Sequence, residues 1–531
     1  MSVPRRVGIP SPLGDFYALL QNSLQGRRSL VDGDPFLPLC PFPAYPPALW
    51  HIHFLRPWAR EGDGQMPWFW AAEGAVNRFV WGPVMLAVLV GVGVYFTWRT
   101  GFLQLRKLGY MFKVTLGSLV QKKKGGTGQN LSPFAAMTTA LAGTMGVGNI
   151  AGIATALTLG GPGAIFWMWL SALFGMMTKY AEVVLAVHYR ETSPDGTHRG
   201  GPMYYIKKGL GRGWGWLSGV FCLLCVCASF GMGDMTQSNT IAQSLRQSFS
   251  IPYWATGVGV MALCALVVLG GLKRIGAFTE KFVPLMSIFY IAASLWVIAV
   301  HRDQVGPAFG LIFRSAFGVR AAAGGVVGYT LQAALRTGVA RGVFTNEAGL
   351  GSAPIAHAAA ETDSPVKQGF WGMFEVFADT FVTCTLTTLV ILTTGMWDSG
   401  LDGAALTTAA FDTVLGRWGS GFIAISVLFF AVSSMLGWCF YGESAMAYLS
   451  RGRQGPVFWY RVVFLALIMV GATVELRPVW QLSDTLNGLM AVPNLLALLL
   501  LSPQVFRLTK EHFATAQKGA KGRRKTGPRR R

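Results

Sequence analysis

The sequence predicts an all-α protein that crosses a lipid bilayer many times. Of its 531 residues, 52% are hydrophobic and only 13% are charged, whereas soluble domains carry about 25% charged residues. Apolar runs of about 20 residues, the length that spans a bilayer as a helix, recur along the chain. Two of these runs are interrupted near their middle by glycine and polar residues, which a simple membrane anchor would not need.

The net charge of +21 lies mostly in loops and in one tail. A membrane protein with positive cytoplasmic loops explains this distribution better than nucleic-acid binding does, and we expect no nucleic-acid partner. The seven cysteines are too scattered for a disulfide framework or a zinc site. Cys222, Cys225 and Cys227 lie in an apolar helix, where free thiols behave as small hydrophobic groups. We therefore expect no cofactor.

Three regions are predicted. Residues 1–65 contain about ten prolines and no membrane-length apolar run, so they are a disordered extension or the result of a start codon placed too far upstream, with Met66 as the alternative start. Residues 78–505 form the transmembrane domain. Residues 506–531 form a basic cytoplasmic tail, which we expect near anionic lipid headgroups.

We count about eleven spans. They lie at about 79–98, 134–159, 162–188, 214–243, 252–272, 279–300, 322–359, 366–396, 418–448, 456–474 and 478–501. The loop 99–130 is basic without an acidic residue, whereas the loop 397–417, predicted on the other side, is acidic. The positive-inside rule then places the N-terminus outside and the C-terminus in the cytoplasm of a bacterial-type inner (plasma) membrane. Arg314 and Arg320, on a loop predicted outside, fit this topology less well.

The first interruption lies in the run 134–159. Gly143, Gly146 and Gly148 fall within six residues, and Asn149 follows them. Each glycine costs roughly 1 kcal/mol in a helix interior, and non-helical backbone persists in a bilayer only where it is buried in protein or lines a wet cavity. We interpret the run as a helix broken at its middle to serve a ligand. The alternative is that its glycines only let another helix pack closely.

The second interruption lies five spans later, where glycines, the Asn346-Glu347 pair and Pro354 break an apolar run. Two interrupted helices at corresponding positions of two five-helix halves indicate a secondary transporter with inverted repeats. Exposed N–H groups of half-helices suit a substrate carboxylate, and unwound carbonyls and hydroxyls suit a hard cation such as Na⁺. A re-entrant turn without a ligand is the alternative for the Asn-Glu segment.

Several sequence motifs resemble one known family. The stretch from Gly160 to Gly175, which reads GGPGAIFWMWLSALFG, looks like the signature of the alanine/glycine:cation symporters, also called sodium:alanine symporters. Supporting motifs are GVGNIAG at 146–152, MTKYAE at 177–182, GGPMYY at 200–205, RGVFTNEAGLGSAP at 341–354, Asp379-Thr380 with Cys384-Thr385, and MLGWCFYGE at 435–443. The resemblance covers about 78–505. It implies a LeuT-like fold of ten core helices (a 5+5 inverted repeat with discontinuous helices) preceded by one extra N-terminal helix.

The resemblance also implies a substrate site. Its predicted residues are Thr144, Gly146, Gly148, Asn149, Gly231, Gln237, Phe344, Asn346, Ser434 and Trp438, and the Na⁺ candidates are Gly143, Thr144, Ser433 and Ser434. Ser434 and Trp438 are four residues apart and share one helix face. An indole facing that hydroxyl would leave room for a methyl group and little else. Ordinary core packing is the alternative for Trp438, and bonds to carbonyls of their own helix are the alternative for the serines.

The chain departs from the family pattern at Asp234, where Asn is usual, and at Thr345, where Ser is usual. The carboxyl group of Asp234 either shifts ion choice toward protons or sits without effect at a wet helix end. Asp379 lies deep in an apolar span, so it is a candidate for ion coupling or gating, with a structural ion pair as the alternative. We expect Lys179 and Glu182 to pair with each other, and His357 to be packed or solvated.

The predicted function is secondary active symport that couples influx of Na⁺, or H⁺, to uptake of a small neutral amino acid, alanine or glycine, by alternating access. A transporter-like amino-acid sensor without net transport is the alternative. An intramembrane enzyme is disfavoured because the sequence contains neither His-Glu-x-x-His nor Gly-x-Ser-x-Gly.

Overall fold

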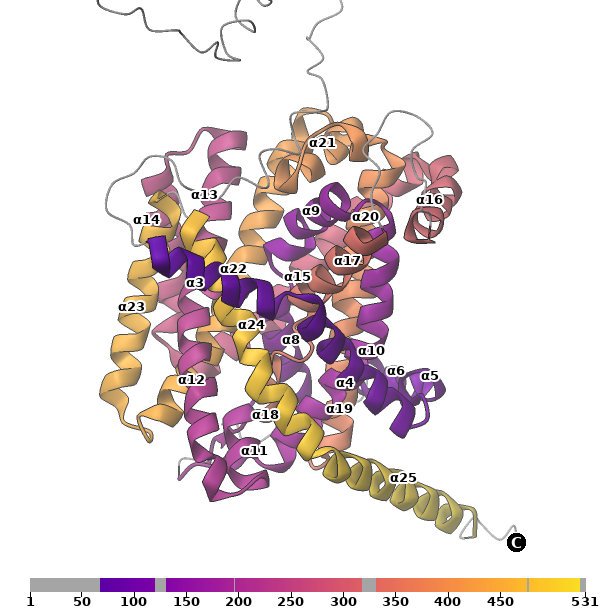
Figure 1. Ribbon diagram of the computed structural model, residues 1–531, viewed down its shortest axis with the longest axis vertical. Coiled ribbons are helices and arrows are strands. Elements are labelled where there is room, and N and C mark those ends of the chain that lie inside the picture. The colour runs from indigo at the N-terminus through magenta and orange to yellow at the C-terminus, as the bar shows by residue number, and fades with distance from the viewer. Residues whose placement is uncertain (1–66, 120–129, 195, 318–330, 475–476, 526–531) are drawn as a thin grey trace, which may run out of the picture. The chain divides into compact units, whose positions relative to one another are not determined.

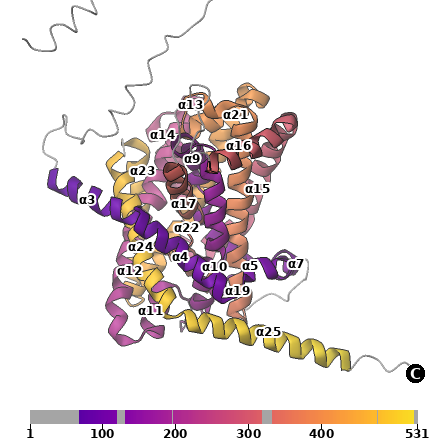
Figure 2. The same cartoon turned by 45° about the vertical axis from the view of Figure 1, so that its right-hand side comes forward.

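The computed structural model describes residues 67–119, 130–194, 196–317, 331–474 and 477–525. The predicted N-terminal extension, the start of the second interrupted run and the last six residues of the basic tail lie outside these ranges. Figures 1 and 2 show that the described chain is almost entirely helical, as predicted. Its two short strands, β1 (Glu191–Thr192) and β2 (His198–Arg199), form an antiparallel hairpin in the loop that follows the third predicted span.

The first half begins with helices that precede the first interruption. These are α3 (Pro67–Val80), α4 (Pro83–Arg99), α5 (Leu103–Arg106), α6 (Leu108–Val114) and α7 (Leu116–Leu119). After the interrupted helix come α10 (Gly163–His188), α11 (Pro202–Gly209), η3 (Arg212–Trp214), α12 (Gly215–Phe230), the π-helical turn η4 (Gly231–Met235), α13 (Thr236–Phe249), α14 (Tyr253–Val268), α15 (Gly271–Val300), η5 (Arg302–Gln304) and α16 (Val305–Phe317).

The second half repeats the order of an interrupted helix followed by long helices. After its interrupted helix come α19 (Pro365–Val376), the π-helical turn η6 (Phe377–Cys384), α20 (Thr385–Thr393), η7 (Met396–Asp398), α21 (Gly403–Leu415), α22 (Arg417–Leu449), α23 (Gln454–Thr473), α24 (Arg477–Leu500) and α25 (Ser502–Lys525).

Both predicted interruptions are present. The first run consists of α8 (Pro133–Thr144), a single 3₁₀ turn η2 (Val147–Asn149) and α9 (Ala151–Gly160). The second consists of α17 (Leu331–Asn346) and α18 (Ala353–Ala358), joined by unwound backbone. In that link Gly349 and Gly351 have φ values of +95° and +85°, which only glycine adopts without strain, so the helix cannot continue.

Burial separates central helices from peripheral ones. In the apolar 18-residue stretch of α10 and in that of α22, 78% of the residues are buried, whereas in the corresponding stretches of α15 and α23 the buried shares are 28% and 33%. The outer helices expose large apolar side chains such as Leu285, Ile288 and Trp459, which suits contact with lipid. Helices hydrophobic all round are expected either in a core or in a membrane, and this chain uses both environments.

Within the described ranges, eight helices are long and apolar enough to cross a membrane. The interrupted helices and the 16-residue α14 are shorter, so the number of eleven spans stays a prediction. The loops predicted around 301–321 and 397–417 contain α16 and α21, because each has an apolar face to bury. α21, for example, buries Leu406, Ala410 and Phe411 and packs on α9 and α22. The tail forms the helix α25 through Lys525, which extends away from the bundle in both views.

The central helix α22 approaches the first interrupted helix through glycine. A Cβ at Gly437 would lie 2.5 Å from the backbone nitrogen of Gly143, so no side chain fits between the two helices. We expect Gly437→Ala to force them apart and to destabilise the fold by about 1–3 kcal/mol, the usual cost of overpacking. Thermal unfolding of the purified protein measures this, with Gly455→Ala as the matched control because a Cβ there meets open space. Equal unfolding temperatures would contradict this packing.

Candidate functional site

The first interruption lies against α13 and α22. A Cβ at Gly146 would lie 3.0 Å from Ser434 Oγ and 3.3 Å from Gln237 Oε1. Ser434 Oγ donates to the carbonyl of Gly143 at 3.0 Å, and the amide of Val147 donates to Gln237 Oε1 at 3.4 Å. The segments around Gly146, Gln237 and Ser434 are distant in sequence and were predicted to form one site, and they meet here.

The two interruptions also meet each other. A Cβ at Gly148 would lie 3.1 Å from Thr345 Cγ2 and 3.7 Å from the Phe344 ring. Asn149 Nδ2 donates to Asp379 Oδ1 at 2.6 Å, and Asn346 Nδ2 donates to Thr380 Oγ1 at 3.2 Å. The asparagine of each interruption is thus held by the π-helical turn η6. The two broken helices share one buried centre, which is the arrangement that a common ligand site requires.

Trp438 lies one turn beyond Ser434 on α22 and is fully buried. Its Cβ lies 2.3 Å from where a Cβ of Gly233 would be, so η4 packs directly on it, and its ring meets Tyr441 edge-on at 5.6 Å. Within the described ranges, the indole Nε1 has no hydrogen-bond partner. Gly231 faces another element, because a Cβ placed there would lie 2.0 Å from Ser483 Oγ of α24.

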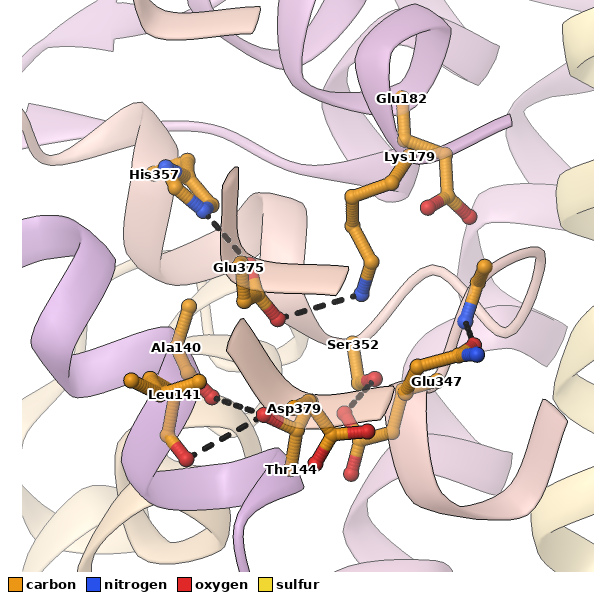
Figure 3. A network of polar contacts seen from close by, with 12 residues as sticks. Ala140, Leu141, Thr144, Lys179, Glu182, Glu347, Ser352, His357, Glu375 and Asp379 are labelled. Atoms are coloured by element: carbon orange, nitrogen blue, oxygen red, sulfur yellow. Dashed lines mark hydrogen bonds and ion pairs between the residues drawn. The ribbon is translucent and has the colours of Figure 1, made fainter. Parts of the chain in front are cut away.

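The hydroxyls proposed as Na⁺ ligands are not equivalent. Ser433 donates to the carbonyl of Phe430 in its own helix at 2.8 Å, as one of the predicted alternatives had it. Thr144 likewise faces the carbonyls of Ala140 and Leu141, at 3.4 and 3.2 Å (Figure 3). Among these candidates, Ser434 donates from α22 to the carbonyl of Gly143, which lies at the C-terminal end of α8.

Sequence reasoning missed several residues that support the first interruption. Thr387 and Thr407 donate to the carbonyls of Asn149 and Ile150 at 2.9 and 3.1 Å, and Tyr441 donates to that of Ala140 at 3.2 Å. A broken helix leaves carbonyls without intrahelical partners, so hydroxyls on neighbouring spans were the signal to look for. The sequence has many such hydroxyls, and only the packing selects among them.

A buried polar network lies behind the second interruption (Figure 3). Lys179 Nζ is 3.4 Å from Glu375 Oε1, and His357 Nε2 is 2.8 Å from Glu375 Oε2. All three side chains are fully buried. The predicted pairing of Lys179 with Glu182 is wrong, because the lysine side chain extends across to α19. His357 is not solvated, and Gln368 occupies its other ring nitrogen at 2.9 Å.

Two further carboxyl groups hold the unwound link itself. Glu182 accepts from the amide of Gly349 at 3.1 Å and from Asn494 Nδ2 at 2.5 Å. Glu347, within the link, accepts a short hydrogen bond from Ser352. Asn494 was missed in the sequence, although an asparagine beside a proline in an apolar span is a signal of the same kind. Glu182 and Asn494 together satisfy the amide and the carbonyl of Gly349, at 3.1 and 2.9 Å, which explains how irregular backbone is tolerated here.

A cavity of about 220 Å³ opens near the loops that carry the positive charge. It is lined by polar side chains that include Asn130, His198, Arg199, Lys273, Glu443 and Arg461, and by none of the predicted site residues. Burial and the nearby Arg190 guanidinium lower the pKa of His198 below its usual range. Arg190 also donates to the carbonyls of Ala360 and Thr362, at 2.6 and 3.0 Å, beyond the end of α18. The cavity lining also includes Leu131, just before α8, and Ala359, just after α18, so the cavity lies beside the ends of the helices that carry the interruptions.

A helical bundle in the membrane with two facing discontinuous helices is the architecture of a transporter, not of an enzyme. Known proteins agree. The chain is 46% identical over 448 residues to the sodium/alanine symporter AgcS of Methanococcus maripaludis (83% of this chain, 97% of that protein). It is 39% identical over 449 residues to the probable sodium/glutamine symporter GlnT of Bacillus subtilis (84% of this chain, 91% of that protein). Residues 68–526 match the sodium:alanine symporter family, and the chain belongs to that family.

Among solved structures, MhsT in complex with L-phenylalanine is similar with a TM-score of 0.50 and 14% identity, over 69% of this chain and 89% of that one. This likeness concerns the fold alone. The fold is LeuT-like, as the resemblance implied.

Proposed function

We propose that the protein is a symporter that couples Na⁺ influx to the uptake of alanine or glycine by alternating access. The observation that carries the proposal is the contact between the two interruptions, where Asn149 and Asn346 meet η6. Family membership supports the class of substrate and ion. The names of the relatives differ in the amino acid, alanine for one and glutamine for another, so the choice of alanine or glycine rests on the site.

The proposed substrate position lies between Gly146, Ser434 and Trp438. The substrate carboxylate would take the place of Asn149 Oδ1 and Gln237 Oε1, which accept from the amides of Gly146 and Val147, as anions bind N–H groups at helix N-termini. The Na⁺ would be held by oxygens near Gly143 and Ser434. In this proposal the N-terminus lies outside and the C-terminus inside the cell, because the most basic loops then face the cytoplasm.

The test is uptake of labelled alanine into proteoliposomes that contain the purified protein, with and without an inward Na⁺ gradient. Accumulation above equilibrium that requires the gradient supports the symporter. Binding of alanine without accumulation would instead indicate a sensor, and neither binding nor uptake would remove alanine as the substrate. Competition by unlabelled glycine and glutamine then ranks the substrates.

Trp438→Ala tests the proposed size limit. We expect the ratio of alanine to glutamine uptake to fall by about 10- to 100-fold, because one or two methylene groups in an apolar pocket change selectivity by this amount. Trp459→Ala is the matched control, since that tryptophan is 64% exposed on α23. Trp438→Phe retains more of the volume and should give an intermediate ratio. Unchanged selectivity in a folded Trp438→Ala protein would place the residue outside the substrate pocket.

A further inference from the structure

The carboxyl group of Asp234 is buried in η4. Asp234 is fully buried, and neither of its oxygens has a hydrogen-bond partner among the described residues. No cation lies within ion-pair distance of it in the described part of the chain. The interpretation that Asp234 sits at a wet helix end is therefore wrong.

Among the described residues, the surroundings of Asp234 offer no cation to compensate a negative charge. Two buried thiols, Cys264 of α14 and Cys439 of α22, are close enough to interact with Asp234 electrostatically. On the other elements packed against η4, the charged or titratable groups interact with other residues. In α23, Arg461 pairs with Glu443 and Tyr460 bonds Ser229, and in α13 Arg246 lies over the ring of Tyr253. In α24, Asp484 lies near Arg341 and Glu73, and in α12 Cys225 and Cys227 lie near each other.

An ionised carboxylate buried without a partner is so costly that the group takes up a proton instead. Asp234 is therefore neutral in this conformation. Its place in the fold connects that proton to the site. The preceding residue, Gly233, packs on Trp438, and Gln237, one turn later, accepts from the amide of Val147 in the first interruption. Because η4 is a π-helical turn, a form that is frequent at functional sites, we expect η4 to be the segment that moves relative to Trp438.

We propose that Asp234 is a proton-binding site of the transport cycle. It is protonated when η4 packs against Trp438 and deprotonated when η4 moves away from Trp438 and exposes the carboxyl group to water. On opening, the carboxyl O–H bond breaks and the proton passes to water, leaving the carboxylate solvated. The proton is thus a second ion that moves with the cycle, beside Na⁺. This inference rests on the proposed symport for its transport test, but not for its stability test.

The transport test uses proteoliposomes that enclose a pH-sensitive dye. In the wild-type protein, Na⁺-driven alanine uptake should be accompanied by a change of internal pH, in either direction, and Asp234→Asn should abolish that change while uptake continues. The uptake rate of the wild type should fall by up to about tenfold for each pH unit once the open-state carboxyl group ionises, since one proton must then be bound before closure. Asp234→Asn should be independent of pH in that range, and Asp234→Glu should restore part of the dependence.

A matched variant separates this site from the other buried acids. Glu347→Gln removes an ionisable group from the network behind the second interruption, and we expect it to retain the pH change. If the pH change persists in Asp234→Asn and disappears in Glu347→Gln, the proton site lies in that network and the proposal is wrong.

The stability test needs no transport. The folded chain holds a proton at Asp234 that the unfolded chain releases above about pH 4, so folding binds a proton and the stability contributed by the neutral form falls as pH rises. The thermal unfolding temperature of the purified protein should therefore decrease more steeply with pH in the wild type than in Asp234→Asn. Identical slopes would overturn the proposal even if the symport assay succeeds. A difference in slope would support the proton site even if alanine uptake is absent.

Discussion

Lys179→Met should strongly reduce the amount of folded protein. Lys179 and Glu375 are both fully buried at 3.4 Å. Removal of Lys179 leaves the buried Glu375 with His357, at 2.8 Å, as its remaining ion-pair partner among the described residues, and breaking a buried ion pair costs about 3–5 kcal/mol. The loss is enhanced because the positive charge of Lys179 also attracts the buried carboxyl groups of Glu182, Glu347 and Asp379. Thermal unfolding and the monodisperse fraction after size-exclusion chromatography measure the effect.

Two controls test whether the broken ion pair causes the loss of stability in Lys179→Met. Lys208 forms a surface pair with Glu191 at 3.0 Å and its side chain is 39% exposed, so Lys208→Met should cost at most about 1 kcal/mol. The double variant Lys179→Met with Glu375→Leu should recover much of the stability, because it removes both charges together. If Lys179→Met is as stable as Lys208→Met, the buried pair does not hold α10 and α19 together in the way described.

Asp379→Ala should reduce Na⁺-driven alanine uptake by about 10- to 100-fold. The carboxylate holds Asn149 of the first interruption at 2.6 Å and also accepts from Thr380, which binds Asn346 of the second. The loss of a hydrogen bond to a charged group costs about 1.5–3 kcal/mol. Here the loss would release Asn149 from Asp379 and would leave Thr380, the partner of Asn346, without its carboxylate acceptor.

Asp379→Asn separates charge from shape. It keeps an oxygen acceptor of the same size, so we expect alanine binding to survive while the Na⁺ concentration for half-maximal uptake rises. Asp398→Asn, at an exposed position in η7, is the control and should behave as the wild type does. An unaltered Na⁺ dependence in Asp379→Asn would leave Asp379 a purely structural residue.

The two interruptions were predictable because their signals are local. Glycines, an Asn-Glu pair and a proline within an apolar run identify where helical backbone ends, whatever the neighbours are. The motifs around Gly146 and Asn346 likewise identified the family. The bounds of α16 and α21 were not predictable in the same way, because an amphipathic helix within a loop resembles a polar connection until its apolar face has a partner.

The partners of buried charges could not be predicted from spacing. Lys179 and Glu182 lie three residues apart, which favours a pair on one helix, yet Lys179 reaches α19 and Glu182 reaches α24. A long side chain in the bilayer interior is directed by whichever helix offers an opposite charge, and that helix is set by the packing of α10 between α17 and α19. The burial of Asp234 could not be predicted either, because the sequence around it is compatible with a solvated and with a buried carboxyl group.

The sequence by itself determined the membrane class, the family and the places where two helices break, since hydropathy, glycine and proline act through the backbone of their own segment. Only the tertiary structure decided that the two breaks meet at η6, that Ser434 rather than Ser433 faces the carbonyl of Gly143 at the end of α8, and that Asp234 is buried without a partner among the described residues. These facts depend on contacts between residues up to 291 positions apart, as between Ser434 and Gly143. No local pattern specifies such contacts, because they follow from how whole helices pack.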